Sequence, residues 1–269
     1  MPGEDTSLLD VSGLRVRVPG RVLVEALDMT LARGEFIAVL GRNGSGKTLS
    51  LLTLGGLRPP AAGDIRLAGD AMGALPRQQV AKRLALLPQD TDDIFPATVL
   101  DTALIGRHPH IGRLRWESAD DRERARDSLA MVGIADLADR DVLSLSGGER
   151  RRVAIAQILT QAPEVYLLDE PTNHLDPQHQ VDTLRIFRRA ADSGAGVIAS
   201  LHDVNLAARV ADRCLLLFGD GRWEFGTTGE VLDEARLEAL FGTPMEAVRW
   251  RGGRLFIAGG GPPRIRQST

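Results

Sequence analysis

The residues best suited to chemistry form the segment GRNGSGKT, residues 41–48, which fits the pattern G-x-x-x-x-G-K-[ST] of phosphate-binding loops. Its glycines allow the backbone to fold around an anion with successive N–H groups pointing inward. The Lys47 ammonium can reach the β- and γ-phosphates of a nucleotide, and the Thr48 hydroxyl can bind Mg²⁺, which prefers oxygen ligands. A strand-like run, residues 36–40, precedes the segment and a helical pattern follows it. This context favours a phosphate site over a glycine-rich turn that only caps a helix.

A second group of candidates follows the apolar run VYLL, residues 165–168, where Asp169 and Glu170 end a predicted buried strand. Ligands of open α/β sheets gather at the carboxyl edge of the strands. Asp169 can therefore hold Mg²⁺, and Glu170 can accept a proton from a water that attacks a phosphate. Without the phosphate loop, the better interpretation would be two carboxylates at the start of a loop with no catalytic role. The phosphate loop favours the catalytic one.

Composition excludes several classes of protein. The chain has 269 residues, with 33 Lys and Arg against 36 Asp and Glu and a formal net charge of −3. A nucleic-acid binder would carry a basic excess. No run approaches the ~18 apolar residues needed to cross a bilayer. The single cysteine, Cys214, cannot form an intrachain disulfide, and the first residues lack the pattern of a signal peptide, so we expect a cytoplasmic chain.

Strand-like runs alternate with helical patterns, which predicts an α/β fold with a largely parallel sheet. Before residue 36, two alternating segments separated by Pro19 and Gly20 predict antiparallel edge strands. Between about residues 98 and 144 the pattern is helical, with Gly133 as a helix C-cap, which predicts a helical insertion. Buried strands are expected at residues 36–40, 84–88, 165–169, 196–201 and 214–218.

The segment LSGGE, residues 145–149, begins a predicted amphipathic helix between the phosphate loop and the strand that ends in LLDE. A Ser-Gly-Gly helix start alone is a common N-cap. In this order, however, the motifs resemble those of ATP-binding cassette (ABC) ATPases, over about residues 8–250. The resemblance implies a P-loop fold with a mixed sheet core, an antiparallel β subdomain and a helical insertion. The implied single domain, residues 1–269, divides into a catalytic core at about 8–97 and 145–250, a helical subdomain at 98–144 and a C-terminal tail at 251–269.

The resemblance assigns further site residues. Gln89 matches the family's Q-loop glutamine, which reaches Mg²⁺, and His202 matches the switch histidine expected to contact the γ-phosphate. Asp176 matches the D-loop that touches the opposite subunit. The expected catalytic residues are Lys47, Gln89, Glu170 and His202, and the expected metal ligands are Thr48, Gln89 and Asp169. The expected nucleotide-binding residues are Val18, Gly41, Arg42, Asn43, Gly44, Ser45, Gly46, Lys47, Thr48, Leu49, Ser146, Gly147, Gly148 and Asp176.

One position departs from the family's pattern. Cassette ATPases usually stack the adenine on an aromatic residue near the first hairpin, but no Phe, Trp or Tyr precedes Phe36 in this sequence. Val18 stands at the matching place, so the adenine contact is expected to be apolar, with a loss of ~1 kcal/mol if stacking is worth what aromatic pairs are. We therefore expect weaker discrimination between ATP and GTP than in relatives that have the aromatic residue.

The chain contains one phosphate loop and one LSGGE, whereas in this family the nucleotide lies between the loop of one subunit and the LSGGE of the other. The resemblance thus implies an ATP-dependent head-to-tail homodimer with two equivalent sites, each holding ATP and Mg²⁺. The helical insertion and the segment after Gln89 would receive the cytoplasmic coupling helix of a separate polytopic permease. The chain would then lie at the cytoplasmic face of the inner (plasma) membrane, with a substrate-binding protein as an indirect partner and no nucleic acid.

The segments IGRHPH, DEPTNHLDPQHQ and HDVNLAARVADR are similar to those of importers for metal chelates, namely haem, cobalamin and ferric siderophores. Two alternatives remain open: an exporter ATPase, and a soluble ABC ATPase without a transport role. His108 and His110 supply fewer ligands than a zinc site needs, so we expect a loop at the permease contact instead. The arginines 150–152 are expected to be solvated or paired with acidic surface groups.

Overall fold

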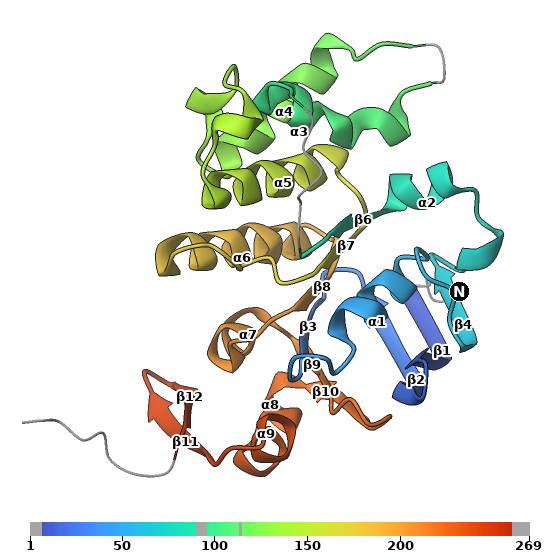
Figure 1. Ribbon diagram of the computed structural model, residues 1–269, viewed down its shortest axis with the longest axis vertical. Helices are drawn as coiled ribbons and strands as arrows, with labels where there is room; N and C mark the ends of the chain where they lie inside the picture. Colours follow the sequence, from blue (N-terminus) through green and yellow to red (C-terminus); the bar gives the residue numbers. More distant parts are fainter. Residues whose placement is uncertain (1–6, 90–95, 113–114, 260–269) are drawn as a thin grey trace, which may run out of the picture.

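The computed structural model describes residues 7–89, 96–112 and 115–259 (Figure 1). Its central sheet has the strand order β10-β9-β3-β8-β7-β6. Neighbouring strands are parallel except for β10, which is antiparallel to β9 at one edge. The predicted α/β class with a mixed sheet is confirmed. The strands are β3 (Phe36–Leu40), β6 (Leu84–Leu87), β7 (Val165–Leu168), β8 (Gly196–Ser200), β9 (Arg213–Leu217) and β10 (Trp223–Thr227).

The strand β3 shows why its sequence is apolar throughout. Phe36, Ala38 and Leu40 belong to one buried cluster, and Ile37 and Val39 belong to another on the opposite face of the sheet. Because side chains alternate between the two faces of a strand, a strand covered on both sides has no polar position. Both faces of the central sheet must therefore be covered by other elements.

A separate antiparallel sheet and one helix cover the first face. β1 (Ser7–Val18) and β2 (Arg21–Ala32) pair antiparallel, as predicted. β2 is an edge strand, but the prediction of an edge strand was wrong for β1, which has a partner strand on both sides. They form their own sheet, in the order β2-β1-β4-β5, with β4 (Ala62–Leu67) and β5 (Asp70–Ala71). Alternation buries one face of each strand without specifying its partner, and here that face packs with α1 (Lys47–Leu54) against the central sheet. The short α2 (Arg77–Arg83) adds Val80 to the same cluster.

Helices cover the second face. α3 (Val99–Leu104), α4 (Ala119–Met131) and α5 (Gly147–Gln161) pack on one another at one end of the molecule (Figure 1). α6 (Pro177–Asp192) follows β7, and α7 (Val204–Val210) follows β8. All five helices contribute side chains to one continuous core with the sheet. In the part of the chain that the structure describes, none of the helices has the length and apolarity to span a membrane.

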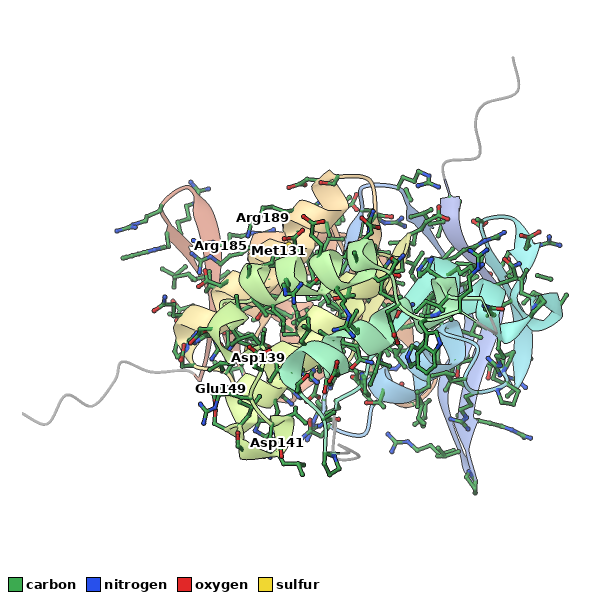
Figure 2. All side chains as sticks on the ribbon, turned by 90° about the horizontal axis from the view of Figure 1, so that it is seen from above. Met131, Asp139, Asp141, Glu149, Arg185 and Arg189 are labelled. Atoms are coloured by element: carbon green, nitrogen blue, oxygen red, sulfur yellow. The ribbon has the colours of Figure 1, made fainter. Side chains whose placement is uncertain are left out.

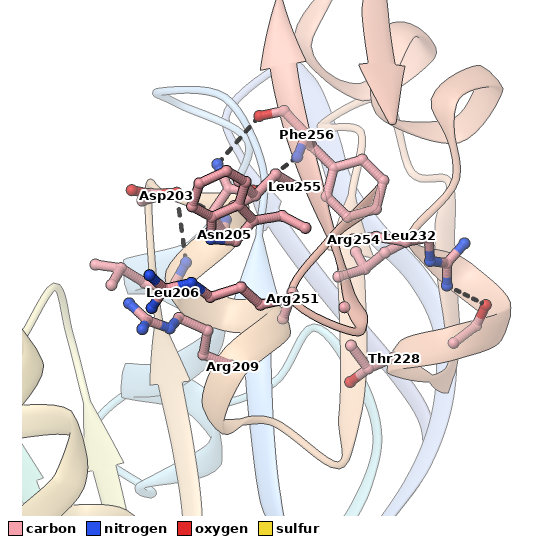
Figure 3. Close-up of a pocket in the computed structure, with 14 residues that line it drawn as sticks. Asp203, Asn205, Leu206, Arg209, Thr228, Leu232, Arg251, Arg254, Leu255 and Phe256 are labelled. Atoms are coloured by element: carbon pink, nitrogen blue, oxygen red, sulfur yellow. Dashed lines mark hydrogen bonds between the residues drawn. The ribbon is translucent and has the colours of Figure 1, made fainter. Parts of the chain in front are cut away.

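The last described elements lie beyond the central sheet. α8 (Thr228–Val231) and α9 (Glu234–Phe241) lead into a hairpin of β11 (Met245–Trp250) and β12 (Gly253–Ala258). Asn205 of α7 holds this hairpin through two hydrogen bonds, because its Oδ1 accepts from the Phe256 N–H at 2.7 Å and its Nδ2 donates to the Phe256 carbonyl at 3.1 Å (Figure 3). The end of the predicted C-terminal tail, residues 260–269, lies outside the described residues.

Candidate nucleotide site

The phosphate-loop motif forms the turn between β3 and α1. Gly46 has a φ of 105° and precedes the first residue of α1, a backbone conformation that side chains other than glycine rarely adopt. Lys47 is 5% exposed, and its Nζ donates to the carbonyls of Gly41 at 2.8 Å and Arg42 at 3.3 Å. A Cβ at Gly41 would lie 2.4 Å from the buried Ser45 Oγ, so the loop leaves no room for a side chain there. The backbone of the loop therefore folds closely around the buried Lys47 ammonium group.

Two buried carboxylates lie near this ammonium group. Burial lowers the pKa of Lys47, and the negative charges of Glu170 and Asp169 oppose that shift. Both acids follow β7 directly, and Ser200 at the end of β8 fixes them: its hydroxyl donates to Asp169 Oδ1 at 2.7 Å and accepts from the Glu170 N–H at 2.9 Å. Glu170 has a φ of 48°, a left-handed conformation that costs a non-glycine residue ~1–3 kcal/mol. Its surroundings must therefore hold it in place.

The Glu170 carboxylate has two side-chain partners. Its Oε1 lies 2.5 Å from Nε2 of His202, which follows β8, and its Oε2 accepts from Nδ2 of Asn173. The Glu170 side chain is thus 8% exposed, and its carboxylate has a fixed orientation. A buried, oriented carboxylate beside an imidazole is suited to accept a proton from a bound water.

These groups share a pocket of about 670 Å³, in the size range of small-molecule sites. The residues that line it are Val18, Arg21, Leu23, Asn43, Gly44, Gly46, Lys47, Thr48, Leu49, Gln89, Glu170, Asn173 and His202. The structure thus brings most of the expected catalytic and loop residues together, although their segments are far apart in the sequence. The expected site residues that do not line this pocket are Gly41, Arg42, Ser45, Asp169, Ser146, Gly147, Gly148 and Asp176.

The LSGGE segment starts α5, with Ser146 and Gly147 exposed and Leu145 buried. Ser146 is the N-cap: its Oγ accepts from the Glu149 N–H at 3.3 Å, and Glu149 Oε2 accepts from the Ser146 N–H at 2.8 Å. Figure 2 shows Glu149 on the same side of the helical part as the exposed Asp139 and Asp141. Asp176 is likewise an exposed N-cap, of α6. Ser146 and Asp176 thus cap the N-termini of their helices, and neither residue lines the pocket of its own chain.

The sequence pattern of the family described as ABC transporter matches residues 24–173. The chain belongs to this family. The predicted enzyme class, an ABC-type ATPase, is thereby confirmed.

Individual relatives of this ABC ATPase cover most of its length. It is 42% identical over 241 residues to the hemin import ATP-binding protein HmuV of Pseudomonas entomophila, over 87% of this chain and 92% of the relative. It is 40% identical over 235 residues to the cobalamin import ATP-binding protein BtuD of Halobacterium salinarum, over 87% of this chain but 58% of that relative's length. An inward-facing structure assigned to the metal-chelate type of ABC transporter matches with a TM-score of 0.81 and 29% identity, over 94% of this chain and 97% of that chain.

The donor groups at the pocket fit Mg²⁺. Thr48 and Gln89 line the pocket, and Asp169 lies beside Glu170 with a buried carboxylate. Mg²⁺ typically takes one or two carboxylates and completes its octahedron with water and substrate phosphates. Among the residues that the structure describes, no cluster of three or more His, Cys, Asp and Glu side chains could hold a metal by itself. The alternative metal site at His108 and His110 therefore has no third ligand within the described chain.

Sequence reasoning missed the role of Arg151. It was expected on a solvated or surface-paired face, but it is 3% exposed and donates to the carbonyls of Pro88, Gln89, Asp169 and Glu170. Helical spacing carried a signal for this. Arg151 lies four residues before Ile155 and seven before Ile158, both buried, so it shares their inward face.

Arg21 was also missed. It lines the pocket beside Val18, and its Nε donates to the Gly219 carbonyl at 2.8 Å. A Cβ at Gly219 would lie 2.9 Å from Ser45 Cα and 3.0 Å from Arg21 Nη2, so these segments approach closely only because residue 219 is glycine. An aromatic ring is not the only group that can contact an adenine, because a planar guanidinium also stacks on ring faces.

Proposed function

We propose that this ABC ATPase is the ATP-hydrolysing subunit of an importer for a metal chelate, namely haem, cobalamin or a ferric siderophore. The relatives named for hemin import and cobalamin import support this proposal, as does the likeness to a transporter of the metal-chelate type. The chain would lie at the cytoplasmic face of the inner membrane through a polytopic permease, with a substrate-binding protein as an indirect partner. The helical part at about residues 98–144 would receive the permease, and the core at about 8–97 and 145–250 would hold ATP.

The chemistry of the pocket follows from its own residues. The loop N–H groups and Lys47 bind the β- and γ-phosphates of ATP. Glu170 takes a proton from the attacking water, and His202, beside that carboxylate, contacts the γ-phosphate. Thr48, Gln89 and Asp169 would hold Mg²⁺, which neutralises charge that develops on the phosphates. The observation that carries the proposal is the pairing of the buried Glu170 carboxylate with the exposed His202 imidazole in the same pocket as the phosphate loop.

We propose that two chains are needed to complete each site. In a head-to-tail dimer, Ser146, Gly147 and Gly148 of one chain would cap the γ-phosphate held by Lys47 of its partner, and Asp176 would lie at the contact between chains. The exposed N-cap geometry of the LSGGE turn supports this arrangement, because the backbone N–H groups of a helix start are donors for an anion.

The catalytic part is tested with Glu170→Gln. We expect this variant to bind ATP with nearly wild-type affinity, to accumulate as an ATP-bound dimer in size-exclusion chromatography, and to lose turnover by about 100-fold or more, because a general base contributes that much. Glu164→Gln is the matched control, since Glu164 is partly exposed and precedes the opposite end of β7. Rapid hydrolysis by Glu170→Gln would contradict the assignment of the base.

The transport part is tested by co-purification and vesicle assays. A polytopic membrane protein should co-purify with the chain, and vesicles that contain both should take up haem, cobalamin or a ferric siderophore when ATP is supplied on the side of this subunit. Recovery with ribosomes alone would contradict the transport role. Efflux driven by ATP would instead identify an exporter.

A further inference from the structure

The Arg151 guanidinium joins two segments of the site. Nη1 donates to the Pro88 carbonyl at 2.6 Å and the Gln89 carbonyl at 3.1 Å. Nη2 donates to the carbonyls of Asp169 and Glu170, both at 2.8 Å. Since β6 and β7 are neighbouring parallel strands, these four oxygens lie at adjacent strand ends, at the carboxyl edge of the sheet. One side chain therefore fixes the positions where both strands lead into the site.

The arrangement is specific for arginine. A buried cation is costly unless its donors are satisfied, and four carbonyl oxygens at hydrogen-bond distance accept from Nη1 and Nη2 of this side chain, which is 3% exposed. A guanidinium is a flat fork whose two terminal nitrogens point to different places, whereas a lysine ammonium is a single point. A lysine at position 151 would keep the charge and reach one strand end, but it could not hold both in the same way.

One of these bonds supports the strained backbone of the proposed base. The Glu170 N–H is held by the Ser200 hydroxyl at 2.9 Å, and the Glu170 carbonyl accepts from the Asn173 N–H at 3.1 Å as well as from Arg151. A backbone at a φ of 48° persists only where its neighbours fix it. Arg151 thus helps to orient the carboxylate that pairs with His202, although it does not line the pocket itself.

The same arginine belongs to the helix that carries the LSGGE turn. Ser146 caps α5, and Arg151 lies on the second turn of this 15-residue helix. A short stretch of α-helix moves as a rigid unit, so a displacement of its first turn also displaces Arg151. The four carbonyl bonds transmit that displacement to Gln89 and Glu170 of the same chain.

We propose that Arg151 is a positioning residue that couples the LSGGE turn of this chain to its own Glu170 and Gln89. This inference rests on the proposed dimer, in which that turn contacts the partner's nucleotide. Nucleotide binding at the partner's phosphate loop fixes the start of α5, and Arg151 then holds the base of this chain's own site in its productive orientation. The two sites of the dimer therefore hydrolyse ATP cooperatively.

The test is steady-state ATP hydrolysis by the purified chain as a function of ATP concentration. For Arg151→Lys we expect kcat to fall about tenfold or more, and the Hill coefficient to fall from above 1 in the wild type towards 1. Binding of ATP by the monomer without Mg²⁺ should stay within about twofold of the wild type, because the phosphate loop is untouched. Arg150→Gln is the control for charge on the same helical turn and should keep kcat and the Hill coefficient.

A second control separates positioning from stability. Leu14→Ala creates a cavity in β1, in the other core cluster, and destabilises the fold without touching α5. Assays are run below the melting temperatures of both variants. Equal losses of kcat and cooperativity in Leu14→Ala and Arg151→Lys would overturn the proposal. So would a cooperative wild type whose Arg151→Lys variant is equally cooperative. A non-cooperative wild type would overturn the coupling, whereas the proposed dimer is tested separately by the ATP-bound dimer of Glu170→Gln.

Discussion

The phosphate-loop half of the pocket and the LSGGE turn are built in different ways. Around the loop, the polar groups of Lys47, Asp169 and Glu170 are buried and bonded to other parts of the same chain. The turn at Ser146 is exposed, and its capping bonds run within four consecutive residues. Contacts with distant segments of the chain therefore preorganise the phosphate-loop half. The LSGGE turn is instead an exposed helix N-terminus whose hydrogen bonds are local.

Beyond the loss expected for Glu170→Gln, the largest effect is expected in the exposed half. Ser146→Ala should lower turnover about 100-fold to 1000-fold, as the loss of one donor to a developing negative charge does, while ATP binding by the monomer changes little. It also removes an N-cap, which should lower the free energy of unfolding by ~1 kcal/mol. Measured turnover and equilibrium ATP binding check this.

Ser144→Ala is the matched control, because Ser144 is exposed two residues earlier and its Oγ donates to the Asp141 carbonyl at 2.7 Å. If ATP binding by monomeric Ser146→Ala fell as much as its turnover, the turn would act on the nucleotide of its own chain. The LSGGE turn and the phosphate loop would then both act on the nucleotide of the same chain, which would contradict the difference proposed between them.

A smaller effect is expected in the helical part that presents the turn. Asp121 Oδ1 accepts from Arg107 at 2.7 Å, and Oδ2 accepts from the Ser118 hydroxyl and N–H. These hydrogen bonds from Ser118, with a further contribution from Arg107, lower the pKa of Asp121 to about 2. Asp121→Asn should therefore lower the free energy of unfolding at pH 7 by ~1–2 kcal/mol, as measured by urea denaturation.

The pH dependence of this effect has a definite sign. Because the pKa of Asp121 in the folded chain is below its ordinary value, the stabilisation is present above about pH 4 and is lost as the pH falls towards 2. The difference between wild type and Asp121→Asn should shrink over that range. Asp120→Asn is the control, since Asp120 forms an exposed pair with Arg124 and should change stability by ~0.5 kcal/mol or less. Equal destabilisation by both variants would contradict the argument.

The smallest effect is expected at the end of the pocket away from the phosphates. Val18→Tyr should raise ATP affinity about fivefold, or ~1 kcal/mol, by adding a ring for the adenine. If the Arg21 guanidinium plane stacks on the adenine, Arg21→Ala should lower ATP affinity by a similar factor without changing the affinity for inorganic tripolyphosphate. Titration calorimetry measures both.

The exposed Arg17 on β1 does not line the pocket, so Arg17→Ala provides the control. An Arg21→Ala variant that also loses tripolyphosphate affinity would place this guanidinium at the phosphates. ATP affinity in the wild type equal to or greater than that of Val18→Tyr would contradict the expected apolar contact.

The sequence predicted the local features of the pocket well and the distant ones poorly. The phosphate loop, the carboxylates after β7 and most of the buried strands are encoded in short contiguous segments. The partners of β1 and β2 are not, because alternation specifies a buried face without specifying which sheet covers it. The left-handed backbone conformation of Glu170 could not be predicted from the sequence, because glutamate does not favour positive φ. Arg151 and Arg21 depend on carbonyls 62 and 198 residues away in the sequence, which no local pattern reveals.

The paired hydrogen bonds between Asn205 and Phe256 have a practical consequence for shortened versions of the chain. Asn205 lies three residues after His202, near the start of α7. Its hydrogen bonds to Phe256 therefore attach the final hairpin to the chain close to the pocket histidine. A truncation before β12 removes both partners of the Asn205 side chain and frees that end of α7. Shortened proteins intended for kinetic work should therefore retain the sequence through Ala258.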